Sequence, residues 1–118
     1  MTTATDYSAL ESRELDALVA ERVFEWAKIR HYAGLAMRRV PAYSTTWEGA
    51  GLVLEAMRER GWNWTVHAYT SLVPGSPFEV ALENGTTPVG PFEWPWADGD
   101  SLPRVVCIAA LRALEAGA

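Results

Sequence analysis

The spacing of apolar residues predicts a first helix between about residues 8 and 29. Apolar positions recur there at three- and four-residue steps, while acidic residues occupy the early turns and basic residues the last. Ser8 with Glu11 forms a capping-box pattern, which marks the expected start of the helix. The apolar positions are Leu15, Leu18, Val19, Val23, Trp26 and Ala27.

A second helix is predicted from Thr45 to about Gly61. Thr45 with Glu48 forms another capping-box pattern, and Gly61 suits the left-handed position just past a helix end. The apolar stripe of this helix consists of Ala50, Val53, Leu54 and Met57. Gly49 and Gly51 lie inside it, and each glycine weakens a helix by up to about 1 kcal/mol relative to alanine. We therefore expect another element or a ligand to approach the helix closely at these positions.

The apolar pattern then changes to a period of two, which is typical of strands. Apolar and polar residues alternate over residues 62–69 and again over 78–83, with a turn rich in proline and glycine at 73–77 between them. Two such runs predict an antiparallel hairpin. Residues 91–96 contain three aromatic residues and two prolines. Because proline cannot donate to a ladder, this last segment is at most an edge strand.

A last helix is predicted over residues 102–115, after a helix-entry signal at 98–101. The order of elements is helix, helix, strands, helix, which indicates an α+β domain. We predict an α/β/α sandwich, in which helices cover both faces of a small antiparallel sheet. Residues 1–118 are expected to form one domain, with a core at about 10–115 and disorder over 1–8.

Composition narrows the class of protein. The chain has 118 residues and a net charge of −5, which argues against general nucleic-acid binding. A single cysteine, Cys107, excludes an intramolecular disulfide and argues against a cysteine-based zinc site. The apolar runs are far shorter than the roughly 20 residues that cross a bilayer, and the first residues lack the features of a secretory signal. We therefore expect a cytoplasmic protein that contacts no membrane and holds no metal or cofactor.

Several short motifs resemble a known family. They are LDALVAE at 15–21 with Trp26, PAYST at 41–45, GWN at 61–63 and VCIAAL at 106–111. Together they resemble the phage ABA-sandwich domain family, which consists of small phage and prophage proteins. The resemblance implies a helix–sheet–helix sandwich of phage or prophage origin, and it implies no known enzyme activity. An acidic residue is expected after Thr45, and because this chain has Thr46 there, the role of that acid does not carry over.

The predicted start of the second helix is a candidate anion site. A helix start carries free amides and a partial positive charge, which suit a phosphate or a carboxylate. Three hydroxyl groups offer hydrogen bonds, two arginines offer positive charge, and either of two aromatic rings is able to stack on a base. These candidate residues are Arg38, Arg39, Tyr43, Ser44, Thr45, Thr46 and Trp47. The alternative interpretation is ordinary capping by Thr45 and core packing of Tyr43.

The tryptophans on the predicted strands divide into two pairs. Trp62 and Trp64 lie on the apolar face of a strand, so we expect both to be core residues. Trp94 and Trp96 lie in a segment broken by proline, which a regular core cannot readily bury. This second pair is therefore a candidate for a ligand-binding or dimer-interface role.

Two other residue types carry candidate chemistry. His67 lies on the opposite strand face from Trp64, where it is either a surface residue or part of a ligand site. Cys107 lies among apolar residues of the last helix, so we expect a buried and inert thiol. The two histidines do not have the spacing of zinc ligands.

These features favour a binding protein over an enzyme. The leading hypothesis is a phage or prophage accessory protein that binds a small anionic ligand without catalysis, such as a nucleotide-type host defence signal. We expect this chain to form a homo-oligomer, because homo-oligomers often form ligand pockets at their interfaces. The first alternative is a protein–protein interaction module that acts on a host or phage protein through Trp94 and Trp96. The second is a small hydrolase that uses His67 with Glu79 or Tyr69.

Overall fold

The computed structural model describes residues 7–25, 40–68, 77–83 and 96–116 of the chain. These residues form three α-helices, one short 3-10 helix and one three-stranded sheet. The elements are η1 (Tyr7–Ala9), α1 (Ser12–Arg22), α3 (Trp47–Glu59), β1 (Asn63–Ala68), β2 (Phe78–Glu83), β3 (Trp96–Gly99) and α4 (Leu102–Ala116). The α+β class predicted from the order of elements is confirmed.

The sheet is antiparallel throughout, in the order β1-β2-β3. The predicted hairpin is present as β1 and β2, in which Trp64 pairs with Leu82 and Val66 pairs with Val80. β3 lies further along the chain than the pattern indicated, because Asp98 and Gly99, which belong to the segment predicted as a helix entry, pair with Glu79 and Phe78. The described ladder between β2 and β3 runs over Trp96–Gly99, which contains no proline, in keeping with the cost of proline in a strand.

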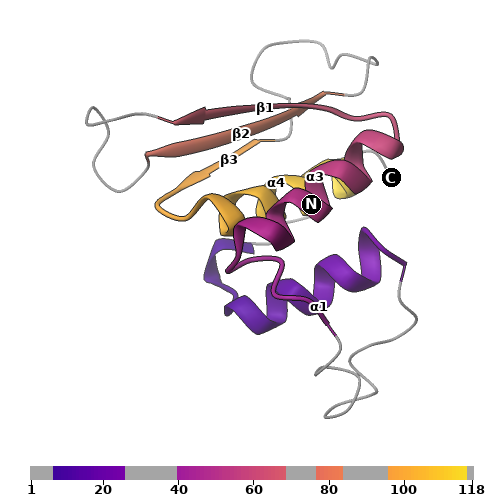
Figure 1. Ribbon diagram of the computed structural model, residues 1–118, viewed down its shortest axis with the longest axis vertical. Helices are drawn as coiled ribbons and strands as arrows, with labels where there is room; N and C mark the ends of the chain where they lie inside the picture. The colour runs from indigo at the N-terminus through magenta and orange to yellow at the C-terminus, as the bar shows by residue number, and fades with distance from the viewer. Residues whose placement is uncertain (1–6, 26–39, 69–76, 84–95, 117–118) are drawn as a thin grey trace, which may run out of the picture.

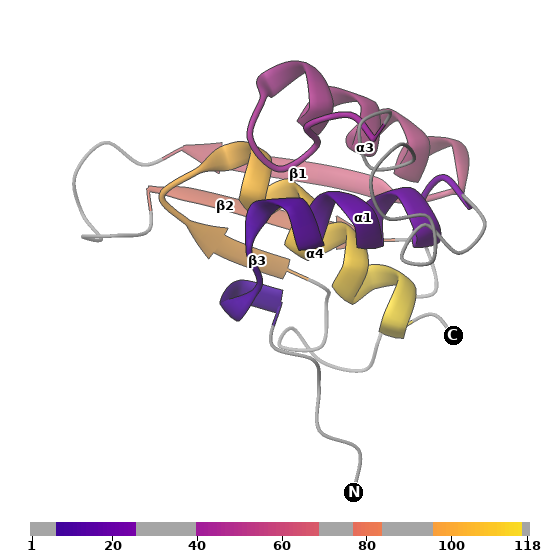
Figure 2. The ribbon, with the colours of Figure 1, turned by 90° about the horizontal axis from the view of Figure 1, so that it is seen from below.

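The described helices lie on one side of the sheet. Figure 1 shows α3 and α4 beneath the sheet and α1 beneath those two helices, and Figure 2 shows the same layers from below. α4 packs against β2 and β3 on one side and against α1 on the other. Among the described elements the layers run sheet, helix pair, single helix, whereas the pattern predicted helices on both sheet faces. The opposite face presents polar residues, including Asn63, Thr65 and His67 of β1, and such a face remains stable in water.

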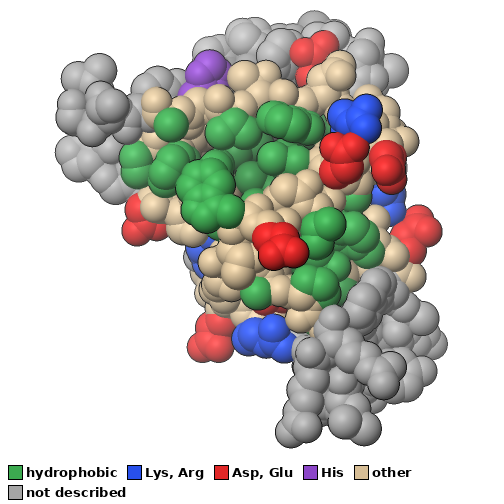
Figure 3. Space-filling model, in the orientation of Figure 1, with side chains coloured by type: hydrophobic (Ala, Val, Ile, Leu, Met, Phe, Trp, Pro, Cys, Tyr) green, Lys and Arg blue, Asp and Glu red, His purple; other side chains and the backbone are tan. Residues whose placement is uncertain are grey.

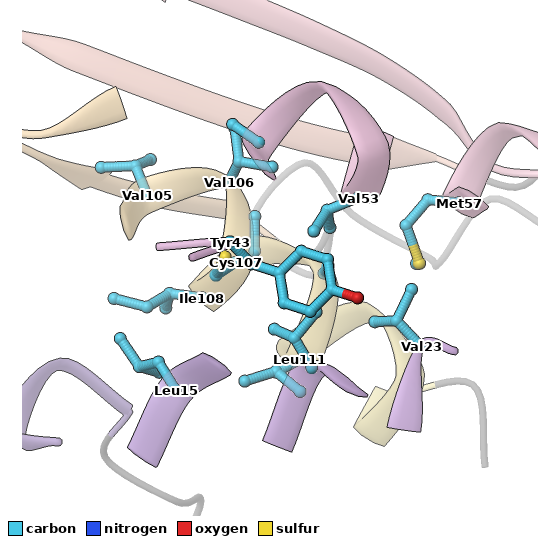
Figure 4. Packing of buried hydrophobic residues seen from close by; sticks show 14 of the residues in the cluster. Leu15, Val23, Tyr43, Val53, Met57, Val105, Val106, Cys107, Ile108 and Leu111 are labelled. Atoms are coloured by element: carbon cyan, nitrogen blue, oxygen red, sulfur yellow. The ribbon is translucent and has the colours of Figure 1, made fainter. Parts of the chain in front are cut away.

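Helix α4 lies at the centre of the hydrophobic core. Residues 105–111 are all buried, so the helix is apolar around almost its whole circumference. Figure 4 shows the ring of Tyr43 among side chains of α3 and α4, including Val53 and Leu111. Small side chains such as Ala109 and Ala110 allow the neighbouring layers to approach α4 closely. The small residues of α4 therefore contribute to its packing against both the sheet and α1.

Both predicted helix starts are displaced along the chain. α1 begins at Ser12, with Glu11 as its N-cap and Glu14 completing the capping box, rather than at Ser8. α3 begins at Trp47, with Thr46 as its N-cap. The Oγ1 of Thr46 accepts a hydrogen bond of 2.9 Å from the backbone N–H of Gly49. A glycine carries no side chain to return the bond, so the capping-box pattern pointed to Thr45 instead.

The glycines of the second helix differ in their surroundings. A Cβ atom on Gly49 would lie 2.4 Å from the carbonyl oxygen of Ala42, so the incoming chain packs directly on the helix backbone. This contact confirms the close approach expected there. A Cβ on Gly51 would meet nothing within 4 Å, so the same expectation is wrong at this position. Gly61 has a φ of +93°, the left-handed conformation predicted past the helix end.

Candidate functional site

A buried carboxylate holds the loop that leads into α3. Asp16 of α1 is 1% exposed, and its Oδ1 accepts a 2.8 Å hydrogen bond from the backbone N–H of Ser44. The same oxygen lies 2.7 Å from Ser44 Oγ, which also lies 3.1 Å from the carbonyl oxygen of Ser12. Arg13 lies 3.6 Å from Asp16 Oδ2. The hydroxyl of Ser44 is thus engaged within the protein, and the loop is tied to α1.

Tyr43 belongs to the core. Its ring is 3% exposed and stacks on Phe24 with a centroid distance of 4.9 Å and an angle of 10° between planes. Burial, with smaller contributions from the neighbouring Asp16 and Cys107, raises the pKa of the Tyr43 hydroxyl. The ring therefore packs as the alternative interpretation described, and its faces are not open to a base.

Three described residues of the candidate anion site are exposed, namely Thr45, Thr46 and Trp47. Trp47 is the first residue of α3 and is 67% exposed, and Thr45 is also exposed. Thr46 Oγ1 accepts from the Gly49 amide and donates to the carbonyl oxygen of Ala42 at 2.9 Å, so this hydroxyl already serves the helix start. Trp47 is consequently an exposed aromatic side chain at the beginning of α3.

Some predicted site residues lie outside the described part of the chain. These are Arg38, Arg39, Tyr69 and Trp94. Trp96 is the first residue of β3, where its backbone pairs with Ala81.

An apolar surface extends from the start of α3 along β1. We define the α3–β1 surface by Trp47, Leu54, Trp64, Val66 and Phe78. The rings of Trp47 and Phe78 meet edge to face, with centroids 6.4 Å apart and planes at 86°. Trp64 is 41% exposed, so its predicted place in the core is wrong, whereas Trp62 is buried as predicted. Figure 3 shows apolar side chains gathered over the sheet and α3.

The hydrolase hypothesis gains little from the geometry. His67 is exposed on the polar sheet face, where its ladder partner is Glu79. Among the described residues, no cluster of three or more His, Cys, Asp and Glu side chains has the arrangement of a metal site. Cys107 is fully buried, and burial raises the pKa of its thiol well above the usual range. A neutral, inaccessible thiol does not act as a nucleophile.

Sequence reasoning missed two polar residues that connect α1 to α3 and to the loop before it. Asp16 is one of the acidic residues of the first helix, yet it shares a stripe with Val19, Ala20 and Val23 at helical steps. That spacing was the available signal of its burial. Arg60, just past α3, donates to the carbonyl oxygens of Arg22 at 3.1 Å and Val23 at 2.8 Å. It thereby binds the C-terminal end of α1, where a cation is favoured.

Comparison with known proteins bears on the fold. No protein-family model matches the chain, and no curated protein matches it. A crystal structure of a phage protein from Bacillus cereus ATCC 14579 is similar to it, with a TM-score of 0.63 and 21% sequence identity. The match covers 96% of this chain and 99% of that one. The chain therefore has the fold of the Bacillus cereus phage protein over almost its whole length.

Among the described helices, none is both long and apolar enough to cross a membrane.

Proposed function

We propose that this chain is a phage or prophage accessory protein that binds a small anionic ligand in the cytoplasm of a bacterial host, without catalysis. The likeness to a phage protein and the resemblance to the phage ABA-sandwich family support the origin. The observation that carries the proposal is Trp47, a tryptophan that is 67% exposed in the first turn of α3. The ligand class is an anion that bears a flat ring, such as a nucleotide-type defence signal.

The indole ring of Trp47 is suited to stack on the ring of such a ligand. A tryptophan offers a large contact area at low entropic cost, because only two side-chain torsions are ordered on binding. The loop before it is held by the hydrogen bonds from Ser44 to Asp16, so the backbone that carries the ring is already positioned. Such preorganisation lowers the free-energy cost of binding.

The anionic group of the ligand would lie against the start of α3. The helix dipole favours negative charge there, and the exposed hydroxyl of Thr45 offers a hydrogen bond. Arg38 and Arg39 precede the loop and supply the countercharge in this proposal. Glu48 is exposed in the same turn and opposes an anion. We therefore expect Glu48→Gln to tighten binding of an anionic ligand.

Calorimetric titration with a panel of mononucleotides and cyclic dinucleotides tests the proposal. We expect at least one of these probes to bind, and Trp47→Ala to weaken that binding by about tenfold or more, or about 1.4 kcal/mol. Leu52→Ala is the matched control, because Leu52 is a 47% exposed residue of the same helix, and it should bind as the wild type does. Binding that survives Trp47→Ala, or no binding by any probe below about 1 mM, would contradict the proposal.

A protein–protein interaction module is the second candidate, and the α3–β1 surface favours it. Tryptophan is enriched among residues that dominate binding energy at interfaces, and both Trp47 and Trp64 are exposed here. These two residues take the role that the sequence suggested for Trp94 and Trp96. This candidate predicts one host or phage protein that copurifies with the chain and is lost in both Trp47→Ala and Trp64→Ala.

A further inference from the structure

Strand β1 forms one edge of the sheet. Its inner side pairs with β2, and within the described residues no strand pairs with its outer side. An edge strand presents a row of backbone N–H and C=O groups that are ready to pair with another strand. β1 pairs with β2 over all six of its residues without a bulge, so this edge is regular along its length.

The usual protections of an edge strand are missing from β1. Natural proteins block such edges with lysine or other charged residues, proline, or a bulge. The strand reads NWTVHA and contains no Asp, Glu, Lys, Arg or Pro. It also carries Trp64, which is 41% exposed beside that edge. An open, uncharged edge with an exposed tryptophan is typical of a surface that pairs with another chain.

We propose that a second copy of this chain pairs with β1 in antiparallel orientation, so that the two sheets form one sheet of six strands. The strand is self-complementary about a two-fold axis. Directly opposed residues in an antiparallel pair point to the same face of the sheet. About a two-fold axis, this condition is met when a residue near the centre of the strand, either Thr65 or Val66, lies opposite its own copy. In the first register Trp64 lies opposite Val66 of the second copy, and in the second register it lies opposite Ala68. Both registers place the exposed indole against an apolar side chain.

The polar side chains of β1 are also compatible with those of the same strand in a second copy. In the two registers His67 lies opposite either Asn63 or Thr65 of the other copy, and none of these is acidic. Each chain has a net charge of −5, so two copies repel each other, and a contact without acidic groups adds least to that repulsion. β1 provides such a contact. Because no like charges oppose each other when two β1 strands pair, the charge pattern favours a second copy as the chain that pairs with this edge.

Pairing of this kind would bring a residue of the partner to the candidate site. On the helix-covered face, Ala68 is the ladder partner of Phe78, and the Phe78 ring contacts Trp47. The partner's Trp64 lies opposite either Ala68 or Val66, the next residue on this face. In both cases it extends the α3–β1 surface toward Trp47. This consequence for ligand binding rests on the proposed function, whereas the strand pairing does not.

Sedimentation velocity of the full chain at about 100 µM tests the pairing. We expect a dimer for the wild type, a monomer for Trp64→Lys, and a dimer for the matched control Leu52→Lys, whose site is 47% exposed on α3. Circular dichroism checks that each variant is folded. A monomeric wild type, or a folded Trp64→Lys variant that dimerises as tightly as the wild type, overturns the proposal.

Single cysteines provide a test that does not depend on Trp64. Opposed Cα atoms in antiparallel strands lie about 4.5–5.5 Å apart, a separation that a disulfide spans. Under mild oxidation, one of Thr65→Cys and Val66→Cys should form a covalent dimer rapidly. Leu52→Cys and the wild type, whose only thiol is the buried Cys107, should not. Equal cross-linking at position 52, or none at 65 and 66, overturns the pairing. A monomer that still binds a nucleotide probe refutes the pairing alone, and a dimer that binds no probe refutes the proposed function alone.

Discussion

Single side chains decide what the start of α3 is able to bind. Ser44 and Thr46 carry hydroxyl groups that suit an anion, yet both are engaged by protein atoms. Tyr43 is stacked on Phe24 in the core. The contrast with Trp47, one residue past the N-cap, shows that neighbours in sequence have opposite roles here. Asp16 causes much of this difference, because it draws Ser44 inward and leaves the following residues at the surface.

Removal of the Asp16 carboxylate should therefore be costly. Asp16→Ala leaves the Ser44 amide without its acceptor in a buried site, and the Ser44 hydroxyl keeps only the Ser12 carbonyl oxygen. We expect the free energy of unfolding to fall by about 2–3 kcal/mol, as measured by urea denaturation. Arg13→Ala is the control, because its guanidinium is 54% exposed, and it should cost at most about 1 kcal/mol. Equal losses in the two variants would show that the ion pair, and not the loop anchor, dominates.

At the scale of elements, the period of the sequence predicted most of the fold. Five of the observed elements, α1, α3, β1, β2 and α4, follow runs with a clear period of 3.6 or 2. The start of α3 was displaced because the capping-box pattern recognises a side chain that returns a bond, which Gly49 does not have. The exposure of Trp64 was not predictable, because a period of two shows which face a residue takes but not how fully a helix covers that face.

The two glycines of α3 give a paired prediction. Gly49→Ala places a methyl group 2.4 Å from the Ala42 carbonyl oxygen, so backbone must move, and we expect a loss of at least about 2 kcal/mol. Gly51→Ala meets open space, and the better helix propensity of alanine should raise stability by up to about 1 kcal/mol. Thermal denaturation of both variants measures the difference. A destabilising Gly51→Ala would indicate a contact at that position that the single chain lacks.

At the scale of the whole molecule, the layers determine which groups never meet water. α4 lies between the sheet and α1, and Cys107 at its middle is 0% exposed. The protonated thiol is favoured in the folded chain, chiefly because burial raises the pKa of Cys107. An unfolded cysteine ionises near pH 8.5. The contribution of the protonated Cys107 thiol to the free energy of unfolding is therefore complete below about pH 8.5 and is lost as the pH rises above it.

Between about pH 8.5 and 10, ionisation of this thiol in the unfolded chain should lower the free energy of unfolding by about 1.4 kcal/mol per pH unit. Cys107→Ala should remove that slope, and urea denaturation at several pH values measures it. The native wild type should also resist thiol reagents that modify the denatured chain at once. Rapid modification of the native protein would show that the layers open readily at α4.

The central place of α4 has a consequence for how the protein is made. α4 (Leu102–Ala116) is synthesised after every other described element, yet α1 (Ser12–Arg22), α3 (Trp47–Glu59) and the sheet all pack on it. The apolar stripes of these earlier elements have no completed surface to cover them until α4 has left the ribosome. Long separations in sequence also slow folding, because the ends of a long loop must meet before their contacts form. The nascent chain therefore emerges with its apolar faces open, and the native structure assembles only after translation has passed α4.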